Sequence, residues 1–135
     1  MKVVIDTNVL LVIIPSVSKY HFVYQLFQLQ QYNIAVSSEI LLEYEEQLKF
    51  RYKLDSVDEE LSELLQKTNV VFFTSDFNWN LITADPDDNK FVDCAIAANA
   101  DFIITNDKHF EVLQSITFPK VNTVTLQQFI HLLEL

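Results

Sequence analysis

Five acidic residues lie in segments that are far apart in the sequence, and each of them stands beside an apolar stretch: Asp6, Glu43, Asp88, Asp93 and Asp107. Asp6 and Asp107 each follow a short apolar run typical of a buried strand. Carboxylates gathered in one cleft repel one another and raise each other's pKa, so such a cluster is costly unless a cation occupies it. Hard divalent ions prefer oxygen ligands, and Mg²⁺ binds a few carboxylates while keeping several waters.

Short apolar runs and amphipathic segments alternate along the whole chain. We predict strands at residues 3–5, 34–36, 70–73, 102–105 and 122–124, and helices at 20–31, 37–53, 56–65, 90–99, 109–113 and 125–133. Capping-box patterns begin at Ser56 and Thr125. This alternation predicts an α/β fold, a three-layer α/β/α sandwich with a mainly parallel central sheet. We expect residues 1–135 to form a single domain.

Ligands of such sheets bind outside the carboxyl ends of the strands. Asp6, Asp107 and the segment that carries Asp88 and Asp93 all fall on this edge, which favours a joint role. Each acid alone also has an ordinary explanation. Asp6 and Asp107 can be turn formers or helix caps, Asp88 lies at a helix start where Asp is a good N-cap, and Glu43 belongs to an acidic helix whose face can simply be solvated.

Polar and basic neighbours can complete a site. Thr7, Asn8, Asn89 and Thr105 are candidates to orient the carboxylates or to bind a phosphate. Asn89 shares a helix face with Asp93 through its i,i+4 spacing. A further set of basic residues can contact phosphates, although solubility and helix-end compensation explain it equally well: Lys49, Arg51, Lys53, Lys90 and Lys108.

The composition excludes several other classes of protein. The chain of 135 residues contains no glycine, which rules out glycine-rich phosphate loops, and its single cysteine rules out an internal disulfide. Its histidines share no metal-ligand spacing with Cys94. The net charge of −10 does not attract nucleic acid or an anionic membrane as a whole. No apolar run is long enough to span a bilayer, and we expect a cytoplasmic protein without membrane contact.

Four blocks of the sequence, in order, resemble the PIN domain family. They are VVIDTNVL at 3–10, SSEILLEY at 37–44, DPDDNKF with DCAIA at 85–97, and ADFIITND at 100–107. The resemblance is strongest to the subgroup described as toxin components of bacterial toxin–antitoxin pairs. It implies a ribonuclease that depends on Mg²⁺ or Mn²⁺ and binds metal through carboxylates. Asn106 stands where many members have Gly or Arg.

We therefore expect a metal-dependent endoribonuclease, the toxin of a toxin–antitoxin pair, that hydrolyses RNA with one or two metal ions. Asp6 and Asp107 are the strongest candidate ligands, and Glu43 with one of Asp88 or Asp93 completes the catalytic site. The alternative is a non-catalytic α/β interaction module whose acidic cleft binds a basic partner peptide. A phosphoryl-transfer domain with Asp6 as nucleophile is less well supported, because no second acid stands at Asn8.

The sequence also suggests how the protein assembles. Phe50, Tyr52 and Leu135 look like exposed apolar positions, which favours a homodimer. An antitoxin protein, the partner that the family resemblance adds, can place an Arg among the acids, because the guanidinium matches carboxylates bidentately.

Overall fold

The computed structural model describes residues 1–52 and 57–134. A five-stranded parallel sheet lies at its centre, in the order β3-β2-β1-β4-β5. The strands are β1 (Lys2–Ile5), β2 (Asn33–Val36), β3 (Val70–Phe72), β4 (Phe102–Ile104) and β5 (Thr123–Val124). Most side chains of β1, β2 and β4 are fully buried, because both faces of a parallel sheet are covered. The α/β fold predicted from the sequence is confirmed.

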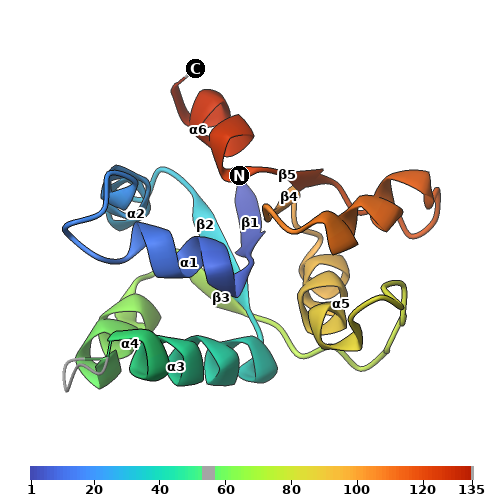
Figure 1. Cartoon of the computed structure of the whole chain (residues 1–135), viewed down its shortest axis with the longest axis horizontal. Coiled ribbons are helices and arrows are strands. Elements are labelled where there is room, and N and C mark those ends of the chain that lie inside the picture. Colours follow the sequence, from blue (N-terminus) through green and yellow to red (C-terminus); the bar gives the residue numbers. More distant parts are fainter. Residues whose placement is uncertain (53–56, 135) are drawn as a thin grey trace.

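Helices cover the sheet on both sides. They are α1 (Thr7–Ile13), α2 (His21–Gln28), α3 (Ser38–Tyr52), α4 (Val57–Gln66), α5 (Asn89–Ala98) and α6 (Leu126–Glu134), with 3₁₀ helices η1 (Pro86–Asp88) and η2 (Lys108–Ser115). Figure 1 shows α1 and α2 on one side of β1 and α5 on the other. This change of side accompanies a reversal of strand order, because the chain runs outward from β1 to β3 and then returns to β4 on the other flank of β1.

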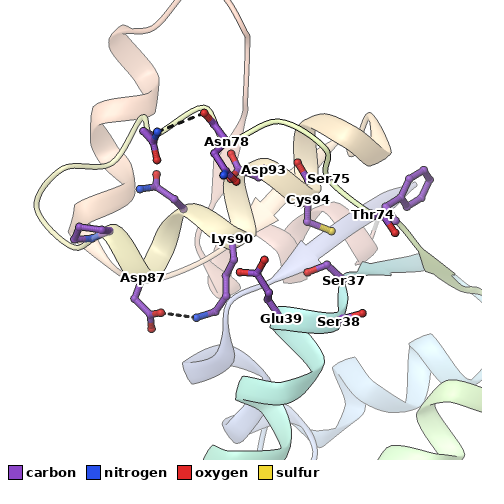
Figure 2. Close-up of a pocket in the computed structure, with 14 residues that line it drawn as sticks. Ser37, Ser38, Glu39, Thr74, Ser75, Asn78, Asp87, Lys90, Asp93 and Cys94 are labelled. Atoms are coloured by element: carbon purple, nitrogen blue, oxygen red, sulfur yellow. Dashed lines mark hydrogen bonds and ion pairs between the residues drawn. The ribbon is translucent and has the colours of Figure 1, made fainter.

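The reversal opens a crevice between the carboxyl ends of β1 and β4, the place where open parallel sheets bind ligands. Asp6 follows β1, and Asp107 follows β4 after two residues. Next to this crevice, α3, α5 and the chain that follows β3 surround a polar cavity of about 250 Å³ (Figure 2). The topology therefore brings residues from the two ends of the chain to one edge of the sheet.

Several local predictions are confirmed and others are wrong. The capping box at Thr125 forms as predicted, with reciprocal hydrogen bonds to Gln128. Helix α1 was not predicted, because its apolar residues are buried around nearly the whole helix and leave no amphipathic period. Tyr52 packs against the core and donates a hydrogen bond to the Leu11 carbonyl, so it is not an exposed interface residue.

The remaining local predictions have mixed outcomes. Phe50 is exposed as expected, with 81% of its surface accessible. Three predictions fall outside the described residues: the capping box that begins at Ser56, the basic residue Lys53 and the apolar position Leu135. Within the described part of the chain, no helix combines the length and the apolar character that crossing a membrane requires.

We predict that Tyr44→Phe lowers the free energy of unfolding by about 1–3 kcal/mol, because a buried carbonyl loses its partner. Tyr44 on α3 is fully buried, and its hydroxyl donates a hydrogen bond to the carbonyl of Ile5, the residue before Asp6. Urea denaturation measures the change. Tyr52→Phe makes the same chemical change at a half-buried position of the same helix and is expected to cost less. Equal effects of the two substitutions would contradict this explanation.

Candidate metal centre

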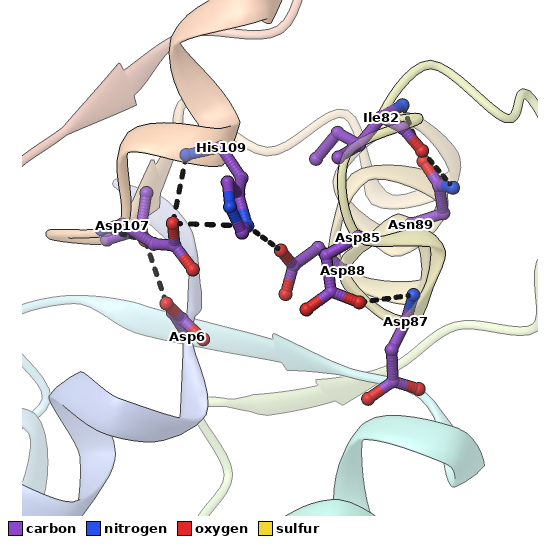
Figure 3. Close-up of polar contacts among 9 residues, drawn as sticks. Asp6, Ile82, Asp85, Asp87, Asp88, Asn89, Asp107 and His109 are labelled. Atoms are coloured by element: carbon purple, nitrogen blue, oxygen red, sulfur yellow. Dashed lines mark hydrogen bonds and ion pairs between the residues drawn. The ribbon is translucent and has the colours of Figure 1, made fainter.

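A chain of hydrogen bonds joins the acids that follow β1 and β4. The backbone N–H of Asp107 donates to Thr105 Oγ1 over 3.0 Å, and the Thr105 hydroxyl donates to Asp6 Oδ2 over 2.8 Å. Thr105 and Asp6 are both buried. Asp6 occupies the N-cap position of α1, yet its side chain makes no capping hydrogen bond. The cap explanation for Asp6 therefore fails, and its carboxylate faces the crevice (Figure 3).

Asp88 and His109 close the opposite side of the crevice. His109 Nδ1 lies 3.5 Å from Asp88 Oδ2 and 3.5 Å from Asp107 Oδ1, and the backbone N–H of His109 donates to Asp107 Oδ1 over 2.9 Å. Asp107 thus caps η2 and also faces the other acids. Asp88 makes no side-chain capping bond, whereas Asp85 accepts one from the N–H of Asp87. The cap of this segment is Asp85 rather than Asp88.

The electrostatics of these acids favour a cation. Burial, opposed in part by the hydrogen bond from Thr105, raises the pKa of Asp6, and the charge of Asp107 raises it further. Burial and the nearby carboxylates of Asp85 and Asp107 raise the pKa of Asp88 to about 6. A divalent ion among these groups would reverse such shifts, because it favours the charged carboxylates.

The donor set also fits a metal ion. Asp85, Asp88 and His109 each offer one ligand atom, and these atoms lie within 4.8 Å of one another. Asp88 Oδ2 is buried, and apart from His109 Nδ1 at 3.5 Å no donor is recorded against it among the described residues. A buried carboxylate oxygen with one long contact is poorly satisfied, so this atom has a bonding direction that a cation can use. Asp88 is shared by this group and by the group with Asp6 and Asp107.

Glu43 belongs to a second set of contacts beside the first. Its Oε2 accepts a hydrogen bond from the Thr7 hydroxyl, and its Oε1 lies 2.7 Å from Lys90 Nζ. Lys90 also forms an ion pair with Asp87 Oδ1 at 3.0 Å. Burial lowers the pKa of Lys90, but hydrogen bonds to Glu43 and Asp87 outweigh it and raise the pKa overall. The ammonium group is therefore charged at neutral pH.

The structure separates Asp93 from the other predicted acids. Asp93 Oδ1 accepts a hydrogen bond from the backbone N–H of Trp79 over 3.1 Å, and Asp93 lines the cavity of Figure 2 together with Glu39. Burial raises the pKa of Asp93, and the charge of Glu39 adds to this effect. Asp93 therefore holds the segment after β3 against α5, while Asp88 faces Asp6 and Asp107.

The predicted polar neighbours have different positions. Thr7 and Thr105 hold carboxylates, as expected of residues that orient them. Asn89 is buried, and its side-chain amide exchanges two 2.9 Å hydrogen bonds with the backbone of Ile82, so it fixes a loop. Asn8 is exposed. Asn106 accepts a hydrogen bond from the N–H of Leu126 and does not take a positive φ, so its turn needs no glycine.

Among the predicted basic residues, only Lys90 enters the acidic cluster in the described part of the chain. Lys108 and Arg51 are exposed, and Lys49 pairs with Glu45 on α3. Asp85 and His109 were not among the predicted site residues, and His109 after Asp107 was interpreted as a surface histidine rather than a substrate contact. Signals for both were present, since Asp85 opens the acidic DPDDN segment and His109 follows Asp107 by two residues, but either pattern alone is common on a protein surface.

Comparison with known proteins places these observations in a family. A model of the PIN domain matches residues 2–109. The fold is similar to VapBC2 from Rickettsia felis bound to a DNA fragment from its promoter, with a TM-score of 0.65 and 18% identity over 93% of this chain and 98% of that chain. No curated protein matches the chain significantly.

Two further solved structures have the same fold. The PIN domain of RRP44 from T. brucei aligns with a TM-score of 0.56 and 15% identity, over 96% of this chain and 78% of that chain. The DNA-bound VapBC of Salmonella typhimurium aligns with a TM-score of 0.57 and 16% identity, over 93% of this chain and 98% of that chain. The family model spans most of the chain and includes every acid of the crevice, and the chain therefore belongs to the PIN domain family.

Proposed function

We propose that the protein is a metal-dependent endoribonuclease that hydrolyses RNA phosphodiesters, and that residues 1–135 form one domain. The observation that carries this proposal is the convergence of Asp6, Asp88 and Asp107 at the crevice between β1 and β4. Membership of the PIN domain family supports a nuclease, because PIN domains are generally nucleases. The same crevice would hold Mg²⁺ or Mn²⁺ through these three carboxylates. Asp85 and His109 offer further ligand atoms within 4.8 Å of one on Asp88.

Hydrogen bonds within the chain already orient the carboxylates of this site without a metal ion. Thr105 fixes one oxygen of Asp6, and the N–H of His109 fixes one oxygen of Asp107, which leaves the other oxygen of each carboxylate for binding. Thr7 holds Glu43 beside them. When bound, the metal supplies hydroxide for attack on phosphorus and stabilises the negative charge that develops on the phosphate.

We also propose an antitoxin partner and a homodimer, with the cytoplasm as the place of action. The similarity to two VapBC structures supports the partner. An Arg of the partner inserted among the acids would compete with metal, since both need the same carboxylates. Phe50 and Leu42, both exposed on α3, support an interface between copies. Light scattering on the isolated protein tests the dimer, and a strict monomer would reject it.

We predict that Asp6→Asn and Asp107→Asn each abolish RNA cleavage while the protein stays folded. The loss follows from removal of metal-binding charge, and relief of carboxylate repulsion leaves stability unchanged or raised. Cleavage of a labelled RNA with and without EDTA measures the activity. Asp76→Asn, which neutralises an exposed aspartate, is the matched control and should retain full activity.

Thermal melts provide a second measurement of the same site. Mn²⁺ at a hundred times its Kd should stabilise the wild-type protein by about 2.7 kcal/mol through mass action. Asp6→Asn should lose most of this gain, and Asp76→Asn should keep it. Full cleavage by purified Asp6→Asn protein would refute the mechanism. Metal and peptide binding without any cleavage by the wild type would favour the interaction module instead.

We predict that Asp88→Asn stabilises the metal-free protein at pH 7 and has no effect at pH 4. The pKa of Asp88 is raised to about 6 from an ordinary value of 3.8, so the folded state binds this proton more tightly than the unfolded state. The contribution of Asp88 to stability is therefore fully present below pH 4 and is lost as the pH rises through 6. A change of about 1 kcal/mol would raise the Tm by about 4 °C.

Melts of both proteins in EDTA across this pH range measure the effect, with Asp76→Asn as control. A difference between wild type and Asp88→Asn that does not vary with pH would contradict the charge explanation. Mn²⁺ affinity of the wild type should also fall below pH 6, because protons compete for the same carboxylate.

A further inference from the structure

The side chain of Lys90 places a positive charge beside the acidic crevice. Its Nζ lies 2.7 Å from Glu43 Oε1 and 3.0 Å from Asp87 Oδ1, and its side chain is only 10% exposed. Helix α5 carries it on the turn that follows Asp88, so the ammonium group lies beside the proposed metal ligands and not on the outer surface. Figure 2 shows Lys90 between Asp87 and the start of α3.

Lys90 and Thr7 together use both oxygens of Glu43. Oε2 accepts from the Thr7 hydroxyl and Oε1 accepts from Lys90. Asp6 and Asp88, by contrast, face the crevice. Among the described residues, His109 is the one basic side chain within ion-pair distance of this group of acids. The acids therefore form two groups. One is already neutralised in part by a lysine, and the other has no resident positive charge of comparable strength.

An ammonium group has three hydrogen-bond donors. Two of those of Lys90 point to Glu43 and Asp87, and Lys90 also lines the polar cavity of about 250 Å³. Asn78, Asn80 and Ser75 line the same cavity, which is open to solvent. A phosphate oxygen that enters from the cavity can thus meet the third donor of Lys90 beside the crevice.

From these contacts we propose that Lys90 takes the place of a second metal ion. The site binds one divalent ion, at Asp6, Asp88 and Asp107, and the ammonium group of Lys90 holds Glu43 and binds an RNA phosphate oxygen that approaches through the cavity. A second divalent ion at Glu43 would lie against the ammonium charge, and this repulsion disfavours its binding. This inference rests on the proposed ribonuclease function and specifies how many ions that function uses.

Manganese stoichiometry tests the proposal without reference to activity. Isothermal titration of the wild type with Mn²⁺ should give one ion per chain. Lys90→Met should take up two, because Glu43 and Asp87 lose their cation, whereas Lys90→Arg and Lys120→Met should stay at one. Lys120 is an exposed lysine outside the crevice and serves as the matched control. Lys90→Gln replaces Lys90→Met if the latter does not fold.

RNA affinity tests the phosphate contact. In EDTA, Lys90→Met should weaken binding of a fluorescent RNA about tenfold, and Lys120→Met less than twofold, because Lys90 lies beside the crevice and Lys120 does not. Two ions in the wild type, one ion in Lys90→Met, or unchanged RNA affinity in Lys90→Met would each overturn the proposal. A wild type that binds no Mn²⁺ and cleaves no RNA would instead reject the proposed function, so the two failures are distinguishable.

Discussion

Mutual repulsion between carboxylates is the constraint on which this molecule depends. Burial and the charge of Asp107 raise the pKa of both Asp6 and Asp88. The sheet withstands this repulsion because β1 and β4 are paired inside a continuous apolar core. Thr105 and the N–H of His109 then hold single carboxylate oxygens in place. The rigid part of the fold thus supports a cleft that is unfavourable when it lacks a cation.

Much of this arrangement could be predicted from local sequence, because buried parallel strands are short, apolar and rich in β-branched residues. That signal located all five strands and placed Asp6 and Asp107 at one edge. It failed for α1, whose apolar residues are buried on almost every side. It also left Asp88 and Asp93 undecided, since the choice depends on where α5 begins. The helix starts at Asn89, which leaves Asp88 outside it and turns Asp93 toward Trp79.

The absence of glycine did not prevent tight backbone turns. Gln30, Asn80 and Asn99 take positive φ angles of 61°, 52° and 52°. Asn99 ends α5 in the left-handed conformation in which glycine is usual, and asparagine tolerates it better than most residues. Two of these three positions are asparagines. At both, the chain takes a positive φ angle with asparagine in place of glycine. Sequence alone could identify asparagine as permissive but not which asparagines would be used.

The hydroxyl of Thr105 and the carboxylate of Asp6 belong to residues 99 positions apart in the chain. Strand β1 pairs with β4, so the edge that carries Asp6 is incomplete until Ile104 has been made. During synthesis, the early segments can pair β1 with β2 and β2 with β3 but cannot yet assemble the crevice. The order of strands therefore makes the acidic crevice one of the last parts of the sheet to assemble, after β2 and β3 have been made.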